Sequence, residues 1–333
     1  MGCILSGGGC GGDRPVVLVV SHQGDNSAPD RVQDALERRG AEVWRLDSDR
    51  FPLDIQLAVG PAEARGWLET AAGLVPLDRL RGVWVRRLAI GHGLPVEGDA
   101  DVRAACIGES RRHLEAWLNG LDVAVMGRPV VLAGARDKLL QLRVARQAGL
   151  AVPDTLLTNN ADSVRDFAAS QPHGLVAKML HAFALGADER VVFTSPVGPE
   201  DLVELSGLAA SPMVFQQAVA AVAEFRVTVV GARALVARLP RAPGGSVDWR
   251  EDAATLAQQW ELGVLPSGVE AAVIRTVHTL GLRFGAVDLV ADAAGTCWFL
   301  EVNPAGEWLW LEQNLGLPIA DALAEELLRE PCP

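Results

Sequence analysis

The sequence predicts an α/β protein: a parallel α/β domain at the N-terminus, followed by segments that mix helices and strands. Its 333 residues, 49% of them hydrophobic and 22% charged, are enough for two or three packed domains. A continuous apolar run at residues 15–21 and a second predicted strand at residues 41–46 flank a helical pattern and so predict a βαβ unit. Near the other end, residues 284–304 have the apolar–turn–apolar pattern of a β-hairpin.

The first domain is predicted at residues 15–125, after a flexible Gly-rich stretch at residues 1–14. Its strands are expected at residues 15–21, 41–46 and 82–88, and its helices at residues 30–39 and 110–118. The first helix has one apolar face and ends at Gly40. The domain contains no G-x-G-x-x-G motif, which excludes a dinucleotide site of the familiar type.

Two further segments of mixed structure are predicted at residues 126–212 and 213–333. In the first, helices are expected at residues 135–147, 160–167 and 199–205, and strands at residues 153–158, 174–179 and 190–194. In the second, strands are expected at residues 214–219, 224–230 and 235–239 before the hairpin, and helices at residues 269–280 and 319–328. Helical apolar spacing and short β-branched runs bounded by turn residues support these assignments.

Composition and charge exclude several classes of protein. The net charge of −12 argues against a nucleic-acid partner, which would need a basic face, although a local basic pocket for a nucleotide stays open. Five cysteines without a C-x-x-C pair predict neither a disulfide framework nor a zinc site, and they favour the cytoplasm. No apolar run reaches membrane-spanning length, so we expect no membrane partner. A homodimer is left open.

The predicted hairpin carries three oxygen-bearing side chains, Asp288, Glu301 and Asn303. Side chains alternate along a strand, so Glu301 and Asn303 share one face, and Asp288 can face the same side if the strands pair. Two carboxylates and an amide suit magnesium, which takes a few protein oxygens and completes its shell with phosphates. The alternative is a solvated face with ordinary acids. The apolar flanks disfavour it, because uncompensated acids are costly there.

Other polar residues match the needs of a magnesium–nucleotide complex. Lys138 and Lys178 offer compact charges for phosphate oxygens, and Arg226 can neutralise charge on a transferred phosphoryl group. The main-chain groups that can hydrogen-bond an adenine edge are those of Gln216, Gln217, Ala218 and Val219. Each residue also has a structural alternative: Lys138 could lie on a solvated helix face, and Arg226 could simply pair with Glu224.

Taken in order, a lysine, a strand lysine, a Gln-Gln pair, an E-x-R strand and a D…E-x-N hairpin resemble the ATP-grasp fold. The resemblance narrows to the graspetide synthetases. The segments that carry it are SHQGDNSAPDRVQDALERRGAEVWRLDSDRFP, VWVRR, DKLLQLRVARQAGLAVPDTLLTNN, FRVTVVG, VDWR and FGAVDLV…FLEVNPAGEWLWLE. One departure is the loop after Lys178, which has only Gly186 where the wider superfamily has a glycine-rich phosphate lid.

This resemblance implies a three-domain α+β ATP-grasp enzyme that uses ATP and Mg²⁺. It implies a ligase that phosphorylates Asp or Glu side chains of a ribosomal precursor peptide. Thr or Ser hydroxyls, or Lys amines, would then attack the acylphosphates and close ester or amide rings. Magnesium, Lys178 and Arg226 would stabilise the developing charge. No protein nucleophile is required, so we assign none.

The resemblance also implies that selectivity comes from a leader peptide bound on a β-hairpin and helix, which match residues 189–205. Glu200, Asp201 and Glu204 would pair with a helical leader. The alternative is that Glu200 and Asp201 only complement the helix dipole. A substrate pocket is expected from charged groups at a strand end and in a loop, namely Arg86, Arg87, Asp248 and Arg250. A solvated rim is the alternative for those four.

Two other functions stay open. A RimK-like or dipeptide ligase would share the ATP site but join small substrates, so ATP turnover with free amino acids separates it from a peptide cyclase. A non-catalytic, nucleotide-gated peptide binder would release no ADP with any peptide. The product bond, the ring topology and the precursor sequence cannot be read from this chain.

Overall fold

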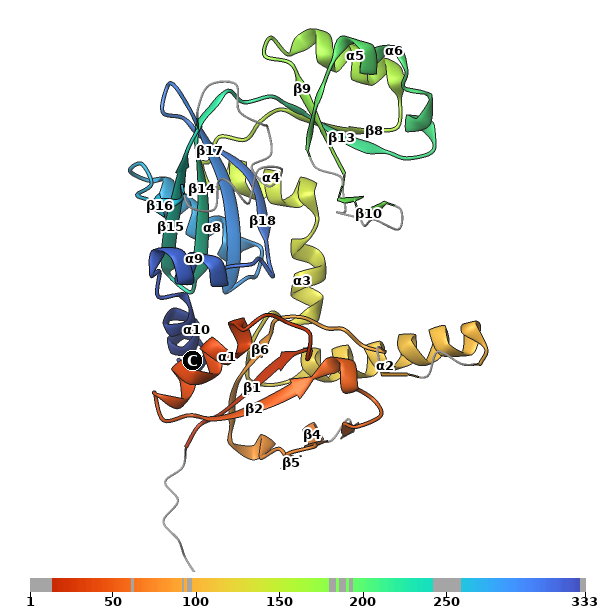
Figure 1. Cartoon of the computed structure of the whole chain (residues 1–333), viewed down its shortest axis with the longest axis vertical. Coiled ribbons are helices and arrows are strands. Elements are labelled where there is room, and N and C mark those ends of the chain that lie inside the picture. The colour runs from red at the N-terminus through yellow and green to blue at the C-terminus, as the bar shows by residue number, and fades with distance from the viewer. Residues whose placement is uncertain are drawn as a thin grey trace, which may run out of the picture. The chain divides into compact units, whose positions relative to one another are not determined.

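The computed structural model describes residues 14–60, 63–91, 93–94, 98–179, 184–185, 190–191, 194–241 and 259–329 (Figure 1). Contacts divide the chain into two compact units, Met1–Ala133 with Pro318–Pro333, and Gly134–Leu317. Parallel strands with helices in the first unit, and antiparallel sheets with helices in the second, confirm the mixed α/β class. None of the helices in the described ranges is long and apolar enough to cross a bilayer.

The first unit is built on a parallel four-stranded sheet with the order β2-β1-β6-β7. Its strands are β1 (Val16–Ser21), β2 (Glu42–Asp47), β6 (Leu80–Val85) and β7 (Ala124–Met126), and its first two helices are α1 (Ala28–Glu37) and α2 (Ala100–Gly120). Every residue of β1 is buried, as its continuous apolar run predicts. The predicted helix at residues 110–118 is too short, because the Asp99 side chain caps α2 ten residues earlier by accepting from the N–H groups of Asp101 and Val102.

A small antiparallel sheet in the first unit was not predicted. Its strands are β3 (Gln56–Gly60), β4 (Glu63–Thr70) and β5 (Gly73–Leu74), in that order. The strands are short, and Gly66 has a positive φ of 61° within β4, which breaks the alternation that identifies a strand. Leu68 is buried from this sheet into the core of the unit.

The C-terminal helix α10 (Ile319–Leu328) belongs to the first unit, although its position in the sequence assigned it to the segment 213–333. It packs against α1 and β6. The Arg39 guanidinium pairs with Asp321 at 2.6 Å and with Glu325 at 3.0 Å. The helix bounds match the predicted ones, but which surface its apolar face covers is a long-range property that helical spacing does not contain.

Part of the second unit is an antiparallel sheet with the order β12-β9-β13-β8. Its elements are β8 (Thr155–Thr158), β9 (Leu175–Lys178), β12 (Ser195–Val197) and β13 (Met213–Gln217), with α5 (Ala161–Ser170) and α6 (Pro199–Val203), while β10 (Ala184–Leu185) pairs with β11 (Arg190–Val191). Val164, Leu175, Leu208 and Phe215 form its core. Because β13 pairs with both β8 and β9, this sheet extends past the boundary predicted between residues 212 and 213.

The other sheet of the second unit has five antiparallel strands in the order β16-β15-β14-β17-β18. The strands are β14 (Ala221–Val230), β15 (Arg233–Pro240), β16 (Glu261–Leu262), β17 (Phe284–Asp292) and β18 (Cys297–Asn303), and the helices are α4 (Lys138–Gln147), α8 (Val269–Thr279) and α9 (Leu309–Leu315). Helix α3 (Pro129–Ala135) begins in the first unit and ends in the second. Strands β17 and β18 are the predicted hairpin, which is confirmed. Helix α4 packs against β18, and α8 packs against β14, β15 and β17 (Figure 1).

Candidate functional site

Three charged residues form a row across neighbouring strands of the five-stranded sheet. Arg226 of β14 lies opposite Asp288 of β17, and Asp288 lies opposite Glu301 of β18. Asn303 follows two residues after Glu301 and pairs in register with Ala286, so it lies on the same face of β18. The strand register therefore gathers one guanidinium, two carboxylates and one amide on a single face.

Arg226 binds Asp288 and does not pair with Glu224 as its structural alternative proposed. Its Nη1 lies 2.8 Å from Asp288 Oδ1 and 2.9 Å from Oδ2, and its Nη2 donates to the Glu307 carbonyl at 3.2 Å. Glu224 instead forms an ion pair with Arg241 at 3.0 Å. Arg226 Nε is buried and has no hydrogen-bond partner within the described ranges, so the guanidinium keeps one donor unused.

Lys138 is the first residue of α4 and its ammonium contacts Glu301, so it does not lie on a merely solvated helix face. The Asp137 side chain caps the helix by accepting from Leu140 N at 2.9 Å, which fixes where α4 begins. Each carboxylate of the row is thus paired with a cation, Asp288 with Arg226 and Glu301 with Lys138. A carboxylate that is charged and paired can exchange its partner for a metal ion without first losing a proton.

The turn after β18 packs against this row. Asn303 Oδ1 accepts from Ala305 N at 3.2 Å, and the Asn303 carbonyl accepts from Gly306 N at 3.3 Å. A Cβ atom at Gly306 would overlap the side chain of Ala286 and lie 2.8 Å from Arg226 Nη2, so only glycine allows the turn to approach this closely. The amide oxygen of Asn303 retains a second lone pair for a metal.

The donor set fits magnesium better than zinc or another soft metal. Across the described part of the chain, no three His, Cys, Asp or Glu side chains come together as a metal cluster. The candidate ligand atoms are all oxygens, those of Asp288 and Glu301 in the row and that of Asn303 beside it. Magnesium needs few protein ligands because substrate phosphates and water fill the remaining positions.

Gln141 is a site residue that sequence reasoning missed. It is fully buried on α4, whereas the apolar side chain of Leu139, two residues before it, is 44% exposed. Its side-chain amide contacts the main chain of Val302, between Glu301 and Asn303. The available signal was its spacing, since position i+3 from Lys138 lies on the same helix face.

Lys178 lies at the end of β9, and the predicted adenine-contacting residues lie at the end of β13 and directly after it. Lys178 Nζ donates to Gln216 Oε1 at 2.7 Å, and Gln216 Nε2 donates to Thr155 Oγ1 at 2.9 Å. The N–H groups of Gln217 and Ala218 donate to the carbonyls of Asp154 at 2.8 Å and Gly174 at 3.0 Å. Strand β13 ends at Gln217, so Ala218 and Val219 lie just beyond the ladder.

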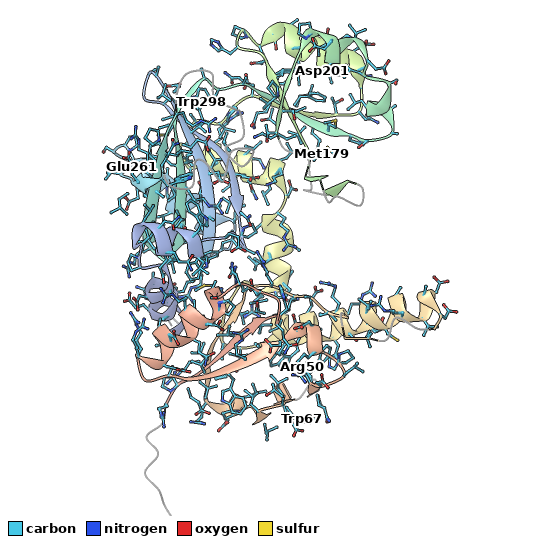
Figure 2. The ribbon with its side chains drawn as sticks, in the orientation of Figure 1. Arg50, Trp67, Met179, Asp201, Glu261 and Trp298 are labelled. Atoms are coloured by element: carbon cyan, nitrogen blue, oxygen red, sulfur yellow. The ribbon has the colours of Figure 1, made fainter. Side chains whose placement is uncertain are left out.

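Two of the three acids expected to bind a leader, Asp201 and Glu204, form local hydrogen bonds in and directly after α6. Asp201 Oδ2 accepts from Gly198 N at 2.8 Å, which caps the helix, and Asp201 lies in α6 as Figure 2 shows. Glu204 Oε1 accepts from the hydroxyl and the N–H of Ser206, and these hydrogen bonds lower the pKa of Glu204. Glu200 lies in the first turn of α6, and like Asp201 and Glu204 it is exposed.

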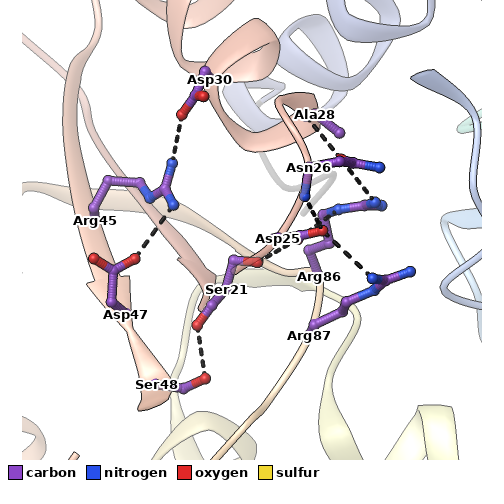
Figure 3. A network of polar contacts seen from close by, with 10 residues as sticks. All are labelled: Ser21, Asp25, Asn26, Ala28, Asp30, Arg45, Asp47, Ser48, Arg86 and Arg87. Carbon is purple, nitrogen blue, oxygen red and sulfur yellow. Dashed lines mark hydrogen bonds and ion pairs between the residues drawn. The ribbon is translucent and has the colours of Figure 1, made fainter. Parts of the chain in front are cut away.

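Arg86 is buried, so it does not lie on the solvated rim that was the alternative to a substrate pocket. Its side chain is 1% exposed, and Nε pairs with Asp25 Oδ2 at 2.9 Å, as Figure 3 shows. Arg87 also pairs with Asp25, at 3.5 Å, but its side chain is 40% exposed. Asp248 and Arg250 lie outside the described residues.

Asp25 is the centre of this buried network. Burial alone would raise the pKa of Asp25, but the Ser21 hydroxyl and the guanidinium groups of Arg86 and Arg87 hold it below its ordinary value. Ser21 Oγ donates to Asp25 at 2.5 Å, and Ser48 Oγ donates to the Ser21 carbonyl at 2.6 Å. The network ties together the carboxyl ends of β1, β2 and β6.

The chain is similar to a family of known proteins along nearly its whole length. The family model of the MvdD pre-ATP grasp domain matches residues 16–129. The macrocyclase MdnC of Microcystis aeruginosa MRC, solved with precursor peptide MdnA, is 34% identical over 94% of this chain and 99% of its own, with a TM-score of 0.83. The RiPP-associated ATP-grasp ligase of Chryseobacterium gregarium, solved with ADP and a leader and core peptide, is 31% identical over 94% and 96%, with a TM-score of 0.88. No curated protein sequence matches the chain.

Proposed function

Because the chain belongs to the RiPP-associated ATP-grasp ligases, we propose that it is an ATP-dependent ligase that macrocyclises a ribosomally made precursor peptide. The observation that carries the proposal is the row Arg226–Asp288–Glu301, with Lys138 on Glu301, in a chain that is similar to solved peptide ligases over nearly its whole length. The candidate metal ligands, the cations beside them and the similarity to peptide ligases occur together in this chain. A hairpin that merely carried solvated acids would explain none of these three features.

The proposed reaction has two steps. An Asp or Glu carboxylate of the precursor attacks the γ-phosphorus of ATP, which forms an acylphosphate and releases ADP. A Thr or Ser hydroxyl, or a Lys amine, then attacks the acyl carbon and expels inorganic phosphate, with loss of the nucleophile's proton. Phosphorylation turns the carboxylate, a poor electrophile, into one with a good leaving group, and each ring closed removes the elements of water from the peptide.

We assign the residues of the row to the phosphates. Asp288, Glu301 and Asn303 would hold Mg²⁺, which supplies charge neutralisation to the phosphate oxygens. Lys138 and Arg226 would turn from these carboxylates to the nucleotide, Lys138 as a point charge and Arg226 at the transferred phosphoryl group. The charges suit this exchange, since Mg²⁺ would take the place of the two cations beside the carboxylates, and the negative phosphates would receive the cations that are released.

The adenine edge is proposed to bind at Ala218 and Val219. The main chain of Gln216 and Gln217 pairs with neighbouring strands, and the N–H groups of Gln217 and Ala218 already donate within the chain. The Ala218 carbonyl and the Val219 N–H therefore remain as the main-chain acceptor and donor for the base. Gln216 serves the site through its side chain, which orients Lys178.

The test is ADP release by the purified protein with a short precursor peptide that is rich in Thr and in Glu or Asp. The proposal predicts ADP release that depends on this peptide, and a peptide mass lowered by one water for each ring. Free glutamate and other amino acids serve as the comparison, because turnover with them would favour a RimK-like or dipeptide ligase. Tight peptide and nucleotide binding without ADP would favour the non-catalytic binder.

Lys178→Ala is expected to weaken ATP binding by about 10–100-fold, because a hydrogen bond to a charged group contributes about 1.5–3 kcal/mol. Titration calorimetry with ATP measures the affinity. Arg165→Ala is a matched control, since Arg165 is a cation of the same subdomain that is bonded to Leu202 and Asp162. Unchanged affinity in the Lys178 variant would make that lysine a support for Gln216 only.

Variants at α6 can test leader docking, because the negative charges of Glu200 and Asp201 can be removed without removing the cap of the helix. The pair Glu200→Gln and Asp201→Asn removes both charges but keeps an oxygen at residue 201 that can accept from Gly198 N. Leader docking predicts at least about tenfold weaker precursor binding with little change in melting temperature. Asp201→Ala, which removes the cap, is the control and should lower stability by about 0.5–2 kcal/mol. Equal precursor affinity in the charge-free variant would place the leader elsewhere.

A further inference from the structure

The outer edge of β18 is closed by an isolated main-chain bridge from Ala151 and by a side chain, and not by a further strand of its sheet among the described residues. Strand β18 is the last in the order of its sheet, so its main chain has no further strand of that sheet beside it in the described ranges. On this edge Phe299 N donates to the Ala151 carbonyl at 2.8 Å, and the two main-chain groups of Val302 bind Gln141. An edge strand covered in this way is fixed in place without a ladder.

The amide of Gln141 acts as the peptide group of a neighbouring strand would. Its Oε1 accepts from Val302 N at 2.9 Å, and its Nε2 donates to the Val302 carbonyl at 2.8 Å and to the Ala135 carbonyl at 2.7 Å. Both amide hydrogens are therefore used, and the side chain is fully buried. Replacing it by an apolar side chain would leave three buried main-chain groups without a partner.

The position of this contact is what connects it to the site. Val302 lies between Glu301 and Asn303, so the direction of its main chain sets the direction of both neighbouring side chains. On the opposite edge, β18 pairs with β17 in regular register from Glu301 to Asn303, and this regular stretch ends at Glu301, where the register shifts between Asp288 and Leu289. Glu301 is therefore the last residue of the regular stretch, and Gln141 holds the same stretch from the other edge through the main chain of Val302.

Gln141 also sets the distance from α4 to the row. Lys138 lies one helical turn earlier and faces the same strand, where it contacts Glu301. We propose that Gln141 is a positioning residue that holds Glu301, Asn303 and Lys138 in the arrangement that binds magnesium with the nucleotide. This inference rests on the proposed function, since it assumes that Glu301 and Asn303 are metal ligands.

Binding measurements without turnover test the inference. ADP affinity is measured by calorimetry in MgCl₂ and in EDTA, well below the melting temperature, for the natural protein and for Gln141→Met, which keeps the length of the side chain but lacks the amide. We expect Gln141→Met to weaken ADP binding by about 10–100-fold in magnesium, the usual effect of removing a group that orients a metal ligand. In EDTA its affinity should stay within about twofold of the natural protein, because the metal ligands are not used there.

A control separates positioning from loss of stability. Thr276→Val removes another fully buried side-chain hydrogen bond of the same unit, from Thr276 Oγ1 to the Ala272 carbonyl at 2.8 Å, and should leave the magnesium effect unchanged. If Gln141→Met does not fold, Gln141→Asn keeps an amide on a side chain that is one methylene shorter. It should show the same loss of ADP affinity in magnesium and not in EDTA.

Equal magnesium dependence in the Gln141 variant and the natural protein would overturn the inference. A natural protein whose ADP affinity ignores magnesium would instead contradict the proposed function.

Discussion

Glu301→Gln should lower peptide-dependent ADP release by about 10²–10³-fold while the protein stays folded. The substitution keeps the shape of the side chain and removes one ligand charge, and a metal contributes several kcal/mol of charge stabilisation, where each ~1.4 kcal/mol is tenfold in rate. Asn303→Ala should act in the same direction by removing the amide oxygen. Coupled-enzyme detection of ADP, at magnesium concentrations from low to saturating, measures both variants.

The fold should survive Glu301→Gln because the pair that it breaks is partly solvated. Lys138 and Glu301 are 30% and 28% exposed, and such pairs contribute little to stability, about 0–1 kcal/mol. Asp292→Asn is the matched control in the same hairpin. Asp292 lies at its turn and binds Trp298 Nε1 at 2.9 Å, so this variant should lose stability and keep turnover. Full turnover of both Glu301→Gln and Asn303→Ala at ordinary magnesium would refute the metal assignment.

The hairpin was predictable because its evidence is local. Two apolar runs around the turn at Asp292–Gly295 define β17 and β18, and strand alternation then places Glu301 and Asn303 on one face. The partner of Arg226 was not predictable in the same way. Glu224 is near it in the sequence, whereas Asp288 becomes its neighbour only through the register of β14 with β17.

The same limit explains the other differences between prediction and structure. Gln141 looks like a polar residue on a helix until β18 is placed against α4, and α10 has a clear apolar face whose partner in the first unit is remote in sequence. Arg86 and Arg87 are adjacent and chemically alike, yet one is buried and the other exposed. Burial of a charge depends on whether the fold supplies its counter-charge, and Asp25 does so from a different loop.

Asp25→Ala should destabilise the protein by about 3–5 kcal/mol, because it leaves the buried guanidinium of Arg86 without its carboxylate. Both side chains are almost fully enclosed, at 1% and 0% exposure, so water cannot replace the lost partner. The double variant Asp25→Leu with Arg86→Met should recover part of this loss, since it removes both charges together. Urea unfolding of the single and double variants measures the free energies and their coupling.

The pH dependence of stability gives this network a second signature. The pKa of Asp25 is lower in the folded protein than its ordinary value of 3.8, so the unfolded chain takes up the proton first. The stabilisation from this carboxylate is therefore fully present above pH 3.8 and is lost as the pH falls through the lower folded pKa. Asp25→Ala should lose less of its remaining stability over that pH range than the natural protein does.

Arg87→Ala is the contrast to Asp25→Ala, because the side chain of Arg87 is 40% exposed and its removal should cost little stability. If Arg87→Ala instead raises the KM for the peptide while Asp25→Ala changes only stability, the substrate role predicted for the arginine pair belongs to Arg87. A stability loss for Asp25→Ala below about 1 kcal/mol would mean that Arg86 finds another partner or reaches water.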